Sequence, residues 1–189
     1  MSFNSIFVRA NQHLVEIARV INKKLSAELL DNMKKTQATL EELWDPYTNQ
    51  YYSRNFVTHK LLKESSIATL LPLYAGTITK ERAKQLVEML ENEHFFGPSY
   101  PVPSVPVNSS WFKPTLYWQG PTWVNMNWLI IDGLERNGFH DHANALKEST
   151  IEIVKHSGFS EYFNPLTGEA AGAPNFSWTA ALTIDLLKT

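Results

Sequence analysis

The stretch YWQGPTWVNMNWLIIDGL, residues 117–134, contains both features on which the fold depends. It begins as an aromatic loop and turns at Gly120-Pro121, a pair of residues that ends regular structure. From there apolar residues recur at the three- and four-residue steps of an amphipathic helix, which we expect to continue to about residue 137. The stretch therefore predicts a long aromatic loop that leads directly into a helix.

The same helical period recurs on both sides of this stretch. Ser26 and Thr79 each precede such a run and carry a hydroxyl oxygen that can cap a helix N-terminus. Pro72 is expected to end the helix before it, because proline lacks the backbone N–H that a helix interior needs. Together with residues 121–137 we predict about seven helices, the others at residues 4–21, 26–43, 59–71, 79–93, 140–156 and 175–187.

Two kinds of connection join these helices. Residues 44–55, WDPYTNQYYSRN, carry the turn residues of a turn or short hairpin. Residues 95–119 and 159–174 are long loops rich in Pro, Gly and aromatic residues, with no helical or strand period. This alternation predicts an all-α fold, an α/α toroid or part of one, with the long loops and a site at one end. The length of the chain predicts a single domain, residues 1–189.

Composition excludes several classes of function. The net charge is -2 with no block of like charges, which argues against recognition of nucleic acid or an anionic membrane by bulk charge. Without Cys there is no thiolate metal site, and His140 and His142 cannot share one helical face. There is no P-loop and no Gly-x-Gly-x-x-Gly motif, so we expect neither metal nor cofactor. No apolar run approaches a membrane span and the N-terminal helix is amphipathic, so we expect a cytoplasmic protein without a membrane partner.

Three segments carry more polar and aromatic groups than a core requires. Trp123 and Asn127 lie one helical turn apart on a shared face, which suits a stacking ring and an amide for a sugar; the alternative is that Trp123 and Trp128 are large core residues. Glu161 is flanked by aromatic residues, which suits a general base at a partly desolvated site, although a loop glutamate is also commonly just solvated. Ser177 is interpreted as the cap of the last helix, since no Gly-x-Ser-x-Gly elbow surrounds it.

Several long motifs resemble one family of enzymes. The stretch at 117–134 and GFSEYFNPLTGEAAGAPNFSWTAALTIDLL at 158–187 resemble the C-terminal half of the catalytic domain of glycoside hydrolase family 63. This group includes mannosylglycerate and glucosylglycerate hydrolases and processing α-glucosidases. LWDPYTNQYYSRN at 43–55, LLPLYAG at 70–76 and FFGPSYPVPSVPV at 95–107 are also similar to the family, so the resemblance covers nearly the whole chain.

The resemblance implies a partial (α/α)6 toroid that cleaves α-glycosidic bonds with inversion, using an Asp as general acid and a Glu as general base. Glu161, in a Glu-Tyr-Phe-Asn run, matches the family's general-base position. The implied carbohydrate substrate is an α-glucoside or α-mannoside, including glycosylglycerates. Side chains of both aromatic loops and of the predicted hairpin would contact it: Trp118, Gln119, Trp123, Tyr162, Phe163 and Trp44.

One catalytic group has no match. In the family the general acid lies in an Asp-Asn-Ser-Pro-Arg-like segment upstream of everything that matches here, and this chain contains no such segment. Asp45 and Asp132 are the internal candidates for a substitute. About seven helices are also too few for a closed ring of twelve. We therefore expect a truncated glycosidase that is completed by a separately encoded N-terminal half or by a second copy in a homodimer. The alternative is a non-catalytic carbohydrate-binding or degenerate fragment that oligomerises.

Overall fold

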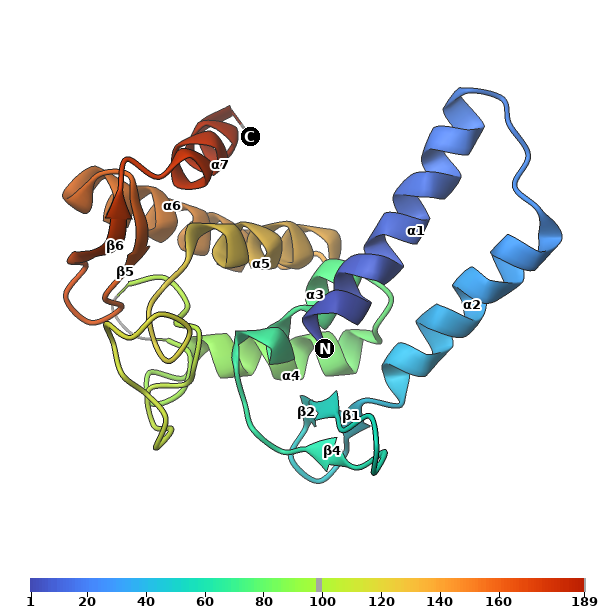
Figure 1. Ribbon diagram of the computed structural model, residues 1–189, viewed down its shortest axis with the longest axis horizontal. Coiled ribbons are helices and arrows are strands. Elements are labelled where there is room, and N and C mark those ends of the chain that lie inside the picture. Colours follow the sequence, from blue (N-terminus) through green and yellow to red (C-terminus); the bar gives the residue numbers. More distant parts are fainter. Residues whose placement is uncertain (98–99, 189) are drawn as a thin grey trace.

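Helices make up most of the computed structural model, which describes residues 1–97 and 100–188 (Figure 1). The elements of this part of the chain, with η1 a short 3-10 helix, are α1 (Ser2–Val20), α2 (Ala27–Glu41), β1 (Trp44–Asp45), β2 (Gln50–Tyr51), β3 (Ser53–Arg54), β4 (Leu61–Leu62), η1 (Ile67–Leu70), α3 (Pro72–Ala75), α4 (Lys80–Glu91), α5 (Val124–Arg136), α6 (His140–Ser157), β5 (Ser160–Phe163), β6 (Ala170–Pro174) and α7 (Ser177–Lys188). The strands pair as three antiparallel two-stranded ribbons, β1 with β2, β3 with β4 and β5 with β6.

α5 lies at the centre of the helix array. It packs against α3, α6 and α7, while α1 packs against α3 and α2. α1 and α2 form an antiparallel pair that projects from the body, and the long loop before α5 lies on the side of α5 that faces away from α7 (Figure 1). The helices thus form an incomplete α/α toroid, with α1 and α2 at one end of the arc and α7 at the other.

Most of the predicted helices are confirmed. α1, α2, α4, α5, α6 and α7 begin and end within a few residues of their predicted bounds. Ser26 Oγ accepts a hydrogen bond from the Leu29 N–H at 3.2 Å, and Thr79 Oγ1 accepts one from the Arg82 N–H at 3.3 Å. The caps predicted at Ser26 and Thr79 are therefore present, whereas Ser177 is the first residue of α7 itself. The predicted hairpin at residues 44–55 is also present, as β1 paired with β2.

The helix predicted for residues 59–71 is wrong. β4 and η1 occupy this segment, and Pro72 begins α3 instead of ending a helix. Asn55 Oδ1 accepts hydrogen bonds from two following backbone N–H groups, each at 2.9 Å, and His59 adopts a left-handed φ of 56°. The chain therefore turns back and pairs β4 with β3, because a side-chain-stabilised turn overrides the apolar period of the segment.

The prediction that residues 159–174 contain no strand is also wrong. These residues form the β5–β6 hairpin, closed by a turn in which the Gly168 N–H donates to the Asn164 carbonyl at 2.8 Å. The strand β6 consists of Ala, Gly and Pro, residues with low strand propensity, which is why the sequence gives no strand signal there.

Two hydrophobic clusters hold the fold together. The larger one joins α3, α4, α5 and the first ribbon, and the smaller one packs α5 and α6 against the inner side of β5. α3 crosses α5 so closely that a Cβ at Gly133 would lie 2.6 Å from the backbone nitrogen of Tyr74. α5 is thereby held by α3 near its C-terminal end and by β5 at its start. The largest fully buried side chains include Trp123, Tyr51, Phe96 and Phe163.

Candidate active site

The two long aromatic loops meet at the start of α5, as the predicted architecture requires. The Thr122 N–H donates to the Phe163 carbonyl at 2.8 Å and the Phe163 N–H donates to the Thr122 carbonyl at 3.0 Å. On its other side Thr122 forms a β-bridge with Pro103. The end of the first loop is therefore paired with β5 like an additional strand, which places this loop beside Glu161 and Tyr162.

Aromatic rings from three segments pack together at this junction, and we call Tyr117, Trp118, Trp123, Tyr162 and Trp178 the aromatic cluster. Trp118 and Trp123 are stacked, with centroids 4.0 Å apart and planes at 4°, and Tyr162 lies 4.9 Å from Trp123. Tyr117 stands edge-on to these three rings, and Trp178 of α7 lies 6.2 Å from Trp123. Trp123 is only 1% exposed, whereas Trp118 is 39% exposed, so Trp118 is the accessible ring of the stacked pair.

Buried hydrogen bonds hold the first loop against α5. Asn127 Oδ1 accepts from the Val102 N–H at 2.9 Å, and Asn127 Nδ2 donates to the carbonyls of Val102 at 3.1 Å and Trp123 at 2.9 Å. Ser104 Oγ accepts from the Gly120 N–H at 2.9 Å. Asn127 is fully buried and its polar atoms are bonded to backbone, so its amide holds the loop from within the core instead of facing a sugar.

Glu161 extends from β5 next to Tyr162 of the aromatic cluster and is partly buried. Its Oε2 accepts a hydrogen bond from the Ala173 N–H on β6 at 3.1 Å. Within residues 1–97 and 100–188, no hydrogen bond reaches its Oε1. One carboxylate oxygen is thus fixed by the backbone, and the other can accept a proton from a water molecule.

The other predicted contacts lie in different surroundings. Phe163 is fully buried beneath β5, where its ring supports the strand. Gln119 is exposed in the first loop, and Trp44 lies on β1, apart from β5 in Figure 1, with its ring 4.8 Å from the Tyr51 ring and 4.8 Å from the Arg82 guanidinium. The predicted residues that the structure brings to one place are Trp118, Trp123, Glu161 and Tyr162.

Asp45 is held in a form that does not suit a general acid. Its Oδ2 lies 2.8 Å from Lys63 Nζ and accepts a hydrogen bond from Thr48 Oγ1 at 2.8 Å. The hydrogen bond to Lys63, followed by that to Thr48, holds the pKa of this carboxyl below its ordinary value. A general acid needs the opposite shift. Asp132 lies nine residues beyond Trp123 along α5, which is about 13 Å of helix.

Sequence reasoning did not assign four residues that the structure brings to this site. Tyr117 and Trp178 complete the aromatic cluster, and Gly172 and Ala173 of β6 lie opposite Glu161. The available signal was Gly172 within Ala-Ala-Gly-Ala-Pro, because a glycine inside an extended segment marks a bulge or a close approach.

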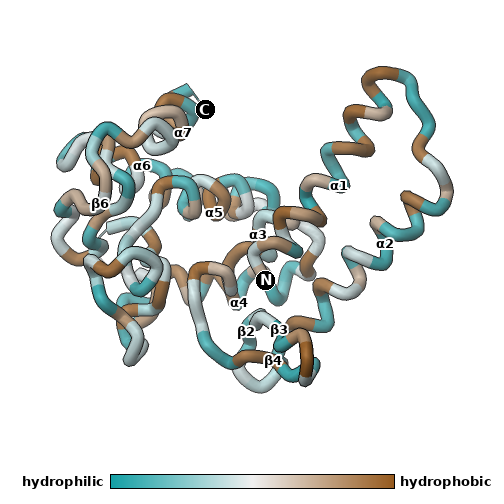
Figure 2. Tube along the Cα trace, in the orientation of Figure 1, coloured by the Kyte–Doolittle hydropathy of each residue, from teal (hydrophilic) through white to brown (hydrophobic). Residues whose placement is uncertain are grey.

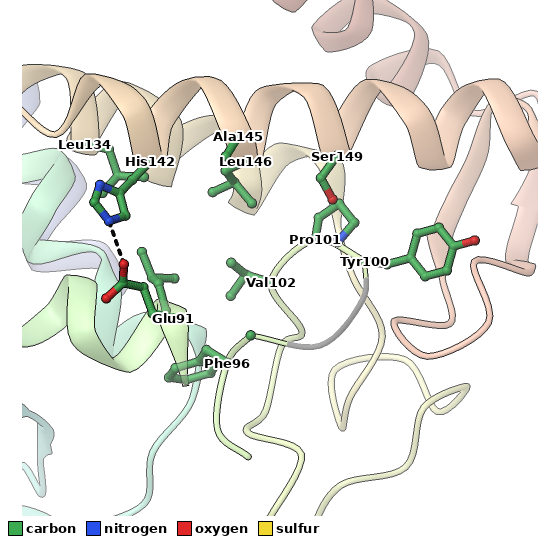
Figure 3. A pocket seen from close by; sticks show the side chains of 12 residues that line it. Glu91, Phe96, Tyr100, Pro101, Val102, Leu134, His142, Ala145, Leu146 and Ser149 are labelled. Atoms are coloured by element: carbon green, nitrogen blue, oxygen red, sulfur yellow. Dashed lines mark hydrogen bonds and ion pairs between the residues drawn. The ribbon is translucent and has the colours of Figure 1, made fainter. Parts of the chain in front are cut away.

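A separate hollow lies between α4, α6 and the start of the first loop (Figure 3). It has a volume of about 220 Å³ and is lined mainly by apolar side chains, among them Phe96, Val102 and Leu146. His142 Nε2 and Glu91 Oε1 approach each other to 2.9 Å at its edge. None of the predicted site residues lines this hollow.

The described residues contain no group of three or more His, Cys, Asp or Glu that could hold a metal ion. Nor does any helix in the described ranges have both the length and the apolar character needed to cross a membrane.

A partial α/α toroid with an aromatic wall beside a carboxylate is the arrangement of a toroidal glycoside hydrolase. Residues 1–179 match the family model described as the mannosylglycerate hydrolase MGH1-like glycoside hydrolase domain. The chain therefore belongs to this glycoside hydrolase family, which confirms the resemblance drawn from its motifs.

Known relatives are longer than this chain. The mannosylglycerate hydrolases of Rubrobacter radiotolerans and Thermus thermophilus are 34% and 36% identical to it, over 98% and 97% of this chain but only 42% and 44% of theirs. The glucosylglycerate hydrolase of Mycolicibacterium hassiacum is 31% identical over 98% of this chain and 43% of its own length. This chain thus spans less than half the length of these relatives.

Solved structures agree with this placement. The crystal structure of a GH63 mannosylglycerate hydrolase from Thermus thermophilus in complex with glucose superposes on all of this chain with a TM-score of 0.93 at 34% identity, and the match covers 47% of that enzyme. The neutral trehalase Nth1 of Saccharomyces cerevisiae superposes with a TM-score of 0.72 at 20% identity over 98% of this chain, which supports the toroidal fold.

Proposed function

We propose that this chain forms the base-bearing part of an inverting α-glycosidase that acts on mannosylglycerate or glucosylglycerate. The observation that carries the proposal is the position of Glu161, which lies next to Tyr162, the residue whose ring packs against the Trp118–Trp123 stack. A flat aromatic ring suits the apolar C–H face of a sugar, and a partly desolvated carboxylate suits a general base. The names of the relatives supply the substrate class.

In this mechanism Glu161 acts on water. Its Oε1 takes a proton from a water molecule while the water oxygen attacks the anomeric carbon from the face opposite the leaving group. The glycosidic C–O bond breaks, and the leaving oxygen receives a proton from a general acid on the other face. The products are a sugar of inverted anomeric configuration and free glycerate. The outer face of Trp118 contacts the sugar, and Tyr162 and Trp123 support that ring from behind.

The general acid comes from a second α-helical segment, the family's other half. An inverting pair requires carboxyl groups roughly 6.5–9.5 Å apart, so that a water fits between base and substrate. Asp45 of β1 is held ionised by Lys63, which follows β4, and an ionised carboxylate cannot serve as the general acid.

The surface for this second half lies at both ends of the arc. Among the described helices, α3 to α6 have no large exposed apolar side chains. Such side chains occur on α1 with its C-cap, on α2 and on α7: Phe3, Ile6, Phe7, Leu14, Val15, Ile17, Val20, Ile21, Leu29, Leu30, Trp178, Ile184 and Leu187. Figure 2 shows the hydrophobic positions along α1 on its projecting pair. Exposed apolar patches of more than a few hundred Å² mark interaction sites, and ring closure requires helices at these two ends.

A second candidate function is sugar binding without turnover. It is favoured by the aromatic cluster, which is already assembled in this chain together with Glu161 but without a matching acid. Both candidates predict binding of glycosylglycerates, but only the enzyme predicts release of glycerate.

The test measures hydrolysis of mannosylglycerate and glucosylglycerate by the chain alone and after addition of an acid-bearing half from a relative. We expect turnover only in the mixture, with inversion seen by NMR of the released sugar, and a loss of about 10²–10⁴-fold in kcat for Glu161→Gln. Glu169→Gln, at an exposed position of the same hairpin, is the control and should stay active. Turnover by the chain alone would refute the external acid, and full activity of Glu161→Gln would refute the assigned base.

A further inference from the structure

The β5–β6 hairpin carries an irregularity directly opposite the carboxylate of the site. Ser160 pairs with Pro174 and Tyr162 pairs with Ala171, so between these pairs Glu161 alone faces two residues, Gly172 and Ala173. One extra residue on one strand is a β-bulge, which bends the strand and re-aims the side chains beside it.

Only a glycine fits in this bulge. Gly172 has a φ of 75°, a conformation that side-chain-bearing residues rarely adopt. A Cβ built there would lie 2.6 Å from Cε1 of Tyr162, 2.7 Å from Oε2 of Glu161 and 2.8 Å from Cβ of Glu161. The Glu161 Cβ cannot move away without moving its backbone, so relief of this contact would displace strand β5 itself. Gly172 thus lies against both the carboxylate and the aromatic ring next to it.

Among the residues that the structure describes, the bulge also supplies the one hydrogen bond that this carboxylate accepts. Because Gly172 lets β6 approach closely, the Ala173 N–H reaches Glu161 Oε2 at 3.1 Å. A backbone donor to one oxygen restricts the rotamer of the carboxylate and leaves Oε1 as the oxygen that can accept from water.

We propose that Gly172 is a positioning residue that aims the Glu161 carboxylate and the Tyr162 ring through the Gly172–Ala173 bulge. The effect of Gly172 on catalysis rests on the proposed function, whereas its effect on the positions of Glu161 and Tyr162 does not. A side chain at residue 172 is expected to separate the Ala173 N–H from Glu161 and to rotate Tyr162 on Trp123, while the rest of the chain keeps its fold.

The structural test follows the Ala173 amide proton by NMR as the pH is lowered through the range in which carboxylates titrate. In the unchanged chain its chemical shift is expected to follow the ionisation of Glu161, and in Glu161→Gln this response should vanish, which identifies its source. In Gly172→Ala the response should be lost and the amide should exchange with solvent about tenfold faster or more, because the hydrogen bond is broken.

Two further variants separate the contact from backbone strain. Gly172→Asn tolerates a left-handed φ but still carries the Cβ, so it should lose the response as Gly172→Ala does. Gly138→Ala introduces a Cβ at a similar φ of 82° where nothing lies within 4 Å, so it should keep the response. A response that persists in both Gly172 variants, or that is lost in Gly138→Ala as well, would overturn the proposal.

The kinetic test uses the mixture with an acid-bearing half. Gly172→Ala is expected to lower kcat about 10²-fold, since a misplacement on the order of 1 Å has that effect, and Gly138→Ala should not. Unchanged kcat in Gly172→Ala with a lost Ala173 response would overturn the catalytic meaning of the bulge. If Glu161→Gln is also fully active, the assigned base is refuted instead, and the NMR result still decides the structural effect.

Discussion

Among single residues, Trp118 and Trp123 determine which aromatic surface of the site is exposed. Trp123 gives one face to Trp118 and lies close to Tyr162 on the other, so almost none of it is exposed. Among the described rings only Trp123 stacks on Trp118, and Trp118 is 39% exposed. Buried Trp123 therefore fixes the orientation of the stacked rings, and Trp118 is the ring that a sugar can contact.

Truncation of these two rings should have unequal effects on stability. Trp123→Ala removes a fully buried ring and is expected to lower the free energy of unfolding by about 3–5 kcal/mol. Trp118→Ala removes mainly one ring contact and should lower it by about 1 kcal/mol. Urea unfolding measures both values, and circular dichroism should show the coupled signal of the stacked indoles vanish in either variant. Equal losses of stability would contradict this division.

The sequence predicts that Trp118, Trp123 and Tyr162 gather at the site, but not that Tyr117 and Trp178 join them or how these rings divide their surfaces. Trp118 and Trp123 have the same side chain in the same motif, and Phe163 adjoins Tyr162 on the same strand. Burial of Trp123 and Phe163 follows from the pairing of Thr122 with Phe163, a contact between segments far apart in the chain. No local pattern encodes such a contact.

At the scale of elements, long helices are predictable from the sequence and short ribbons are not. α5 and α6 follow from apolar periods that extend over several turns. The segment with β4 and η1 has apolar residues at a similar spacing, which is why it resembles a helix in sequence. What decides its structure is the turn at Asn55 and a hydrogen bond from the Ile67 N–H to the distant Ser104 carbonyl at 3.0 Å.

The first ribbon should confer pH-dependent stability through Asp45. Its lowered pKa means that the folded chain holds this proton more weakly than the unfolded chain does. The ionised carboxylate therefore stabilises the fold above the unfolded-state pKa, and this contribution is lost as the pH falls through the folded-state pKa. Unfolding in urea should show that Asp45→Asn is less stable than the unchanged chain at neutral pH. The difference in unfolding free energy between the two should become smaller below about pH 4.

The control for this experiment is Asp31→Asn, which breaks an exposed pair with Lys35 on α2. Exposed ion pairs contribute little to stability, so Asp31→Asn should lower the free energy of unfolding at neutral pH by less than Asp45→Asn does. A gap for Asp45→Asn that stays constant down to strongly acidic pH would show that the carboxylate charge has no part in the stability of the ribbon.

The close crossing of α3 over α5 gives a further prediction. Gly133→Ala places a methyl group against the backbone of Tyr74. Alanine favours the helix by about 1 kcal/mol, but overpacking costs about 1–3 kcal/mol, so we expect a net loss of stability. Asn144→Ala, at an exposed position of α6, keeps only the helix gain and should be neutral or stabilising in thermal unfolding. A more stable Gly133→Ala variant would mean that the two helices can separate at little cost.

In the whole molecule, the helices at the two ends of the arc expose apolar side chains, whereas the helices between them bury theirs. α3 to α6 bury their large apolar side chains in the two clusters, whereas α1 and α7 each lack a neighbour on one side. The number of helices predicts this incompleteness from the sequence, but it cannot show which faces are left open, because that depends on the order of packing around α5.

Polar substitutions at one end of the arc should weaken association without unfolding the chain. Ile17 and Val20 of α1 are 55% and 71% exposed. The double variant Ile17→Ser, Val20→Ser is expected to bind an acid-bearing half at least tenfold more weakly and to abolish dimers of this chain in light scattering, with stability within about 0.5 kcal/mol of the unchanged chain. Phe56→Ser, at an exposed ribbon tip, should associate normally. The opposite pattern would place the interface on the ribbons.

The hydrogen bonds that Asn127 and Ser104 make within and to the first loop also affect the entropy and the heat of ligand binding. Because these bonds form when the chain folds, the loop has little freedom left to lose when a sugar arrives. Binding to Trp118 should therefore carry a small entropic penalty and a favourable heat in titration calorimetry. In Asn127→Ala the loop would have to be ordered by the ligand itself, so the same contacts would form with a larger heat and a weaker affinity.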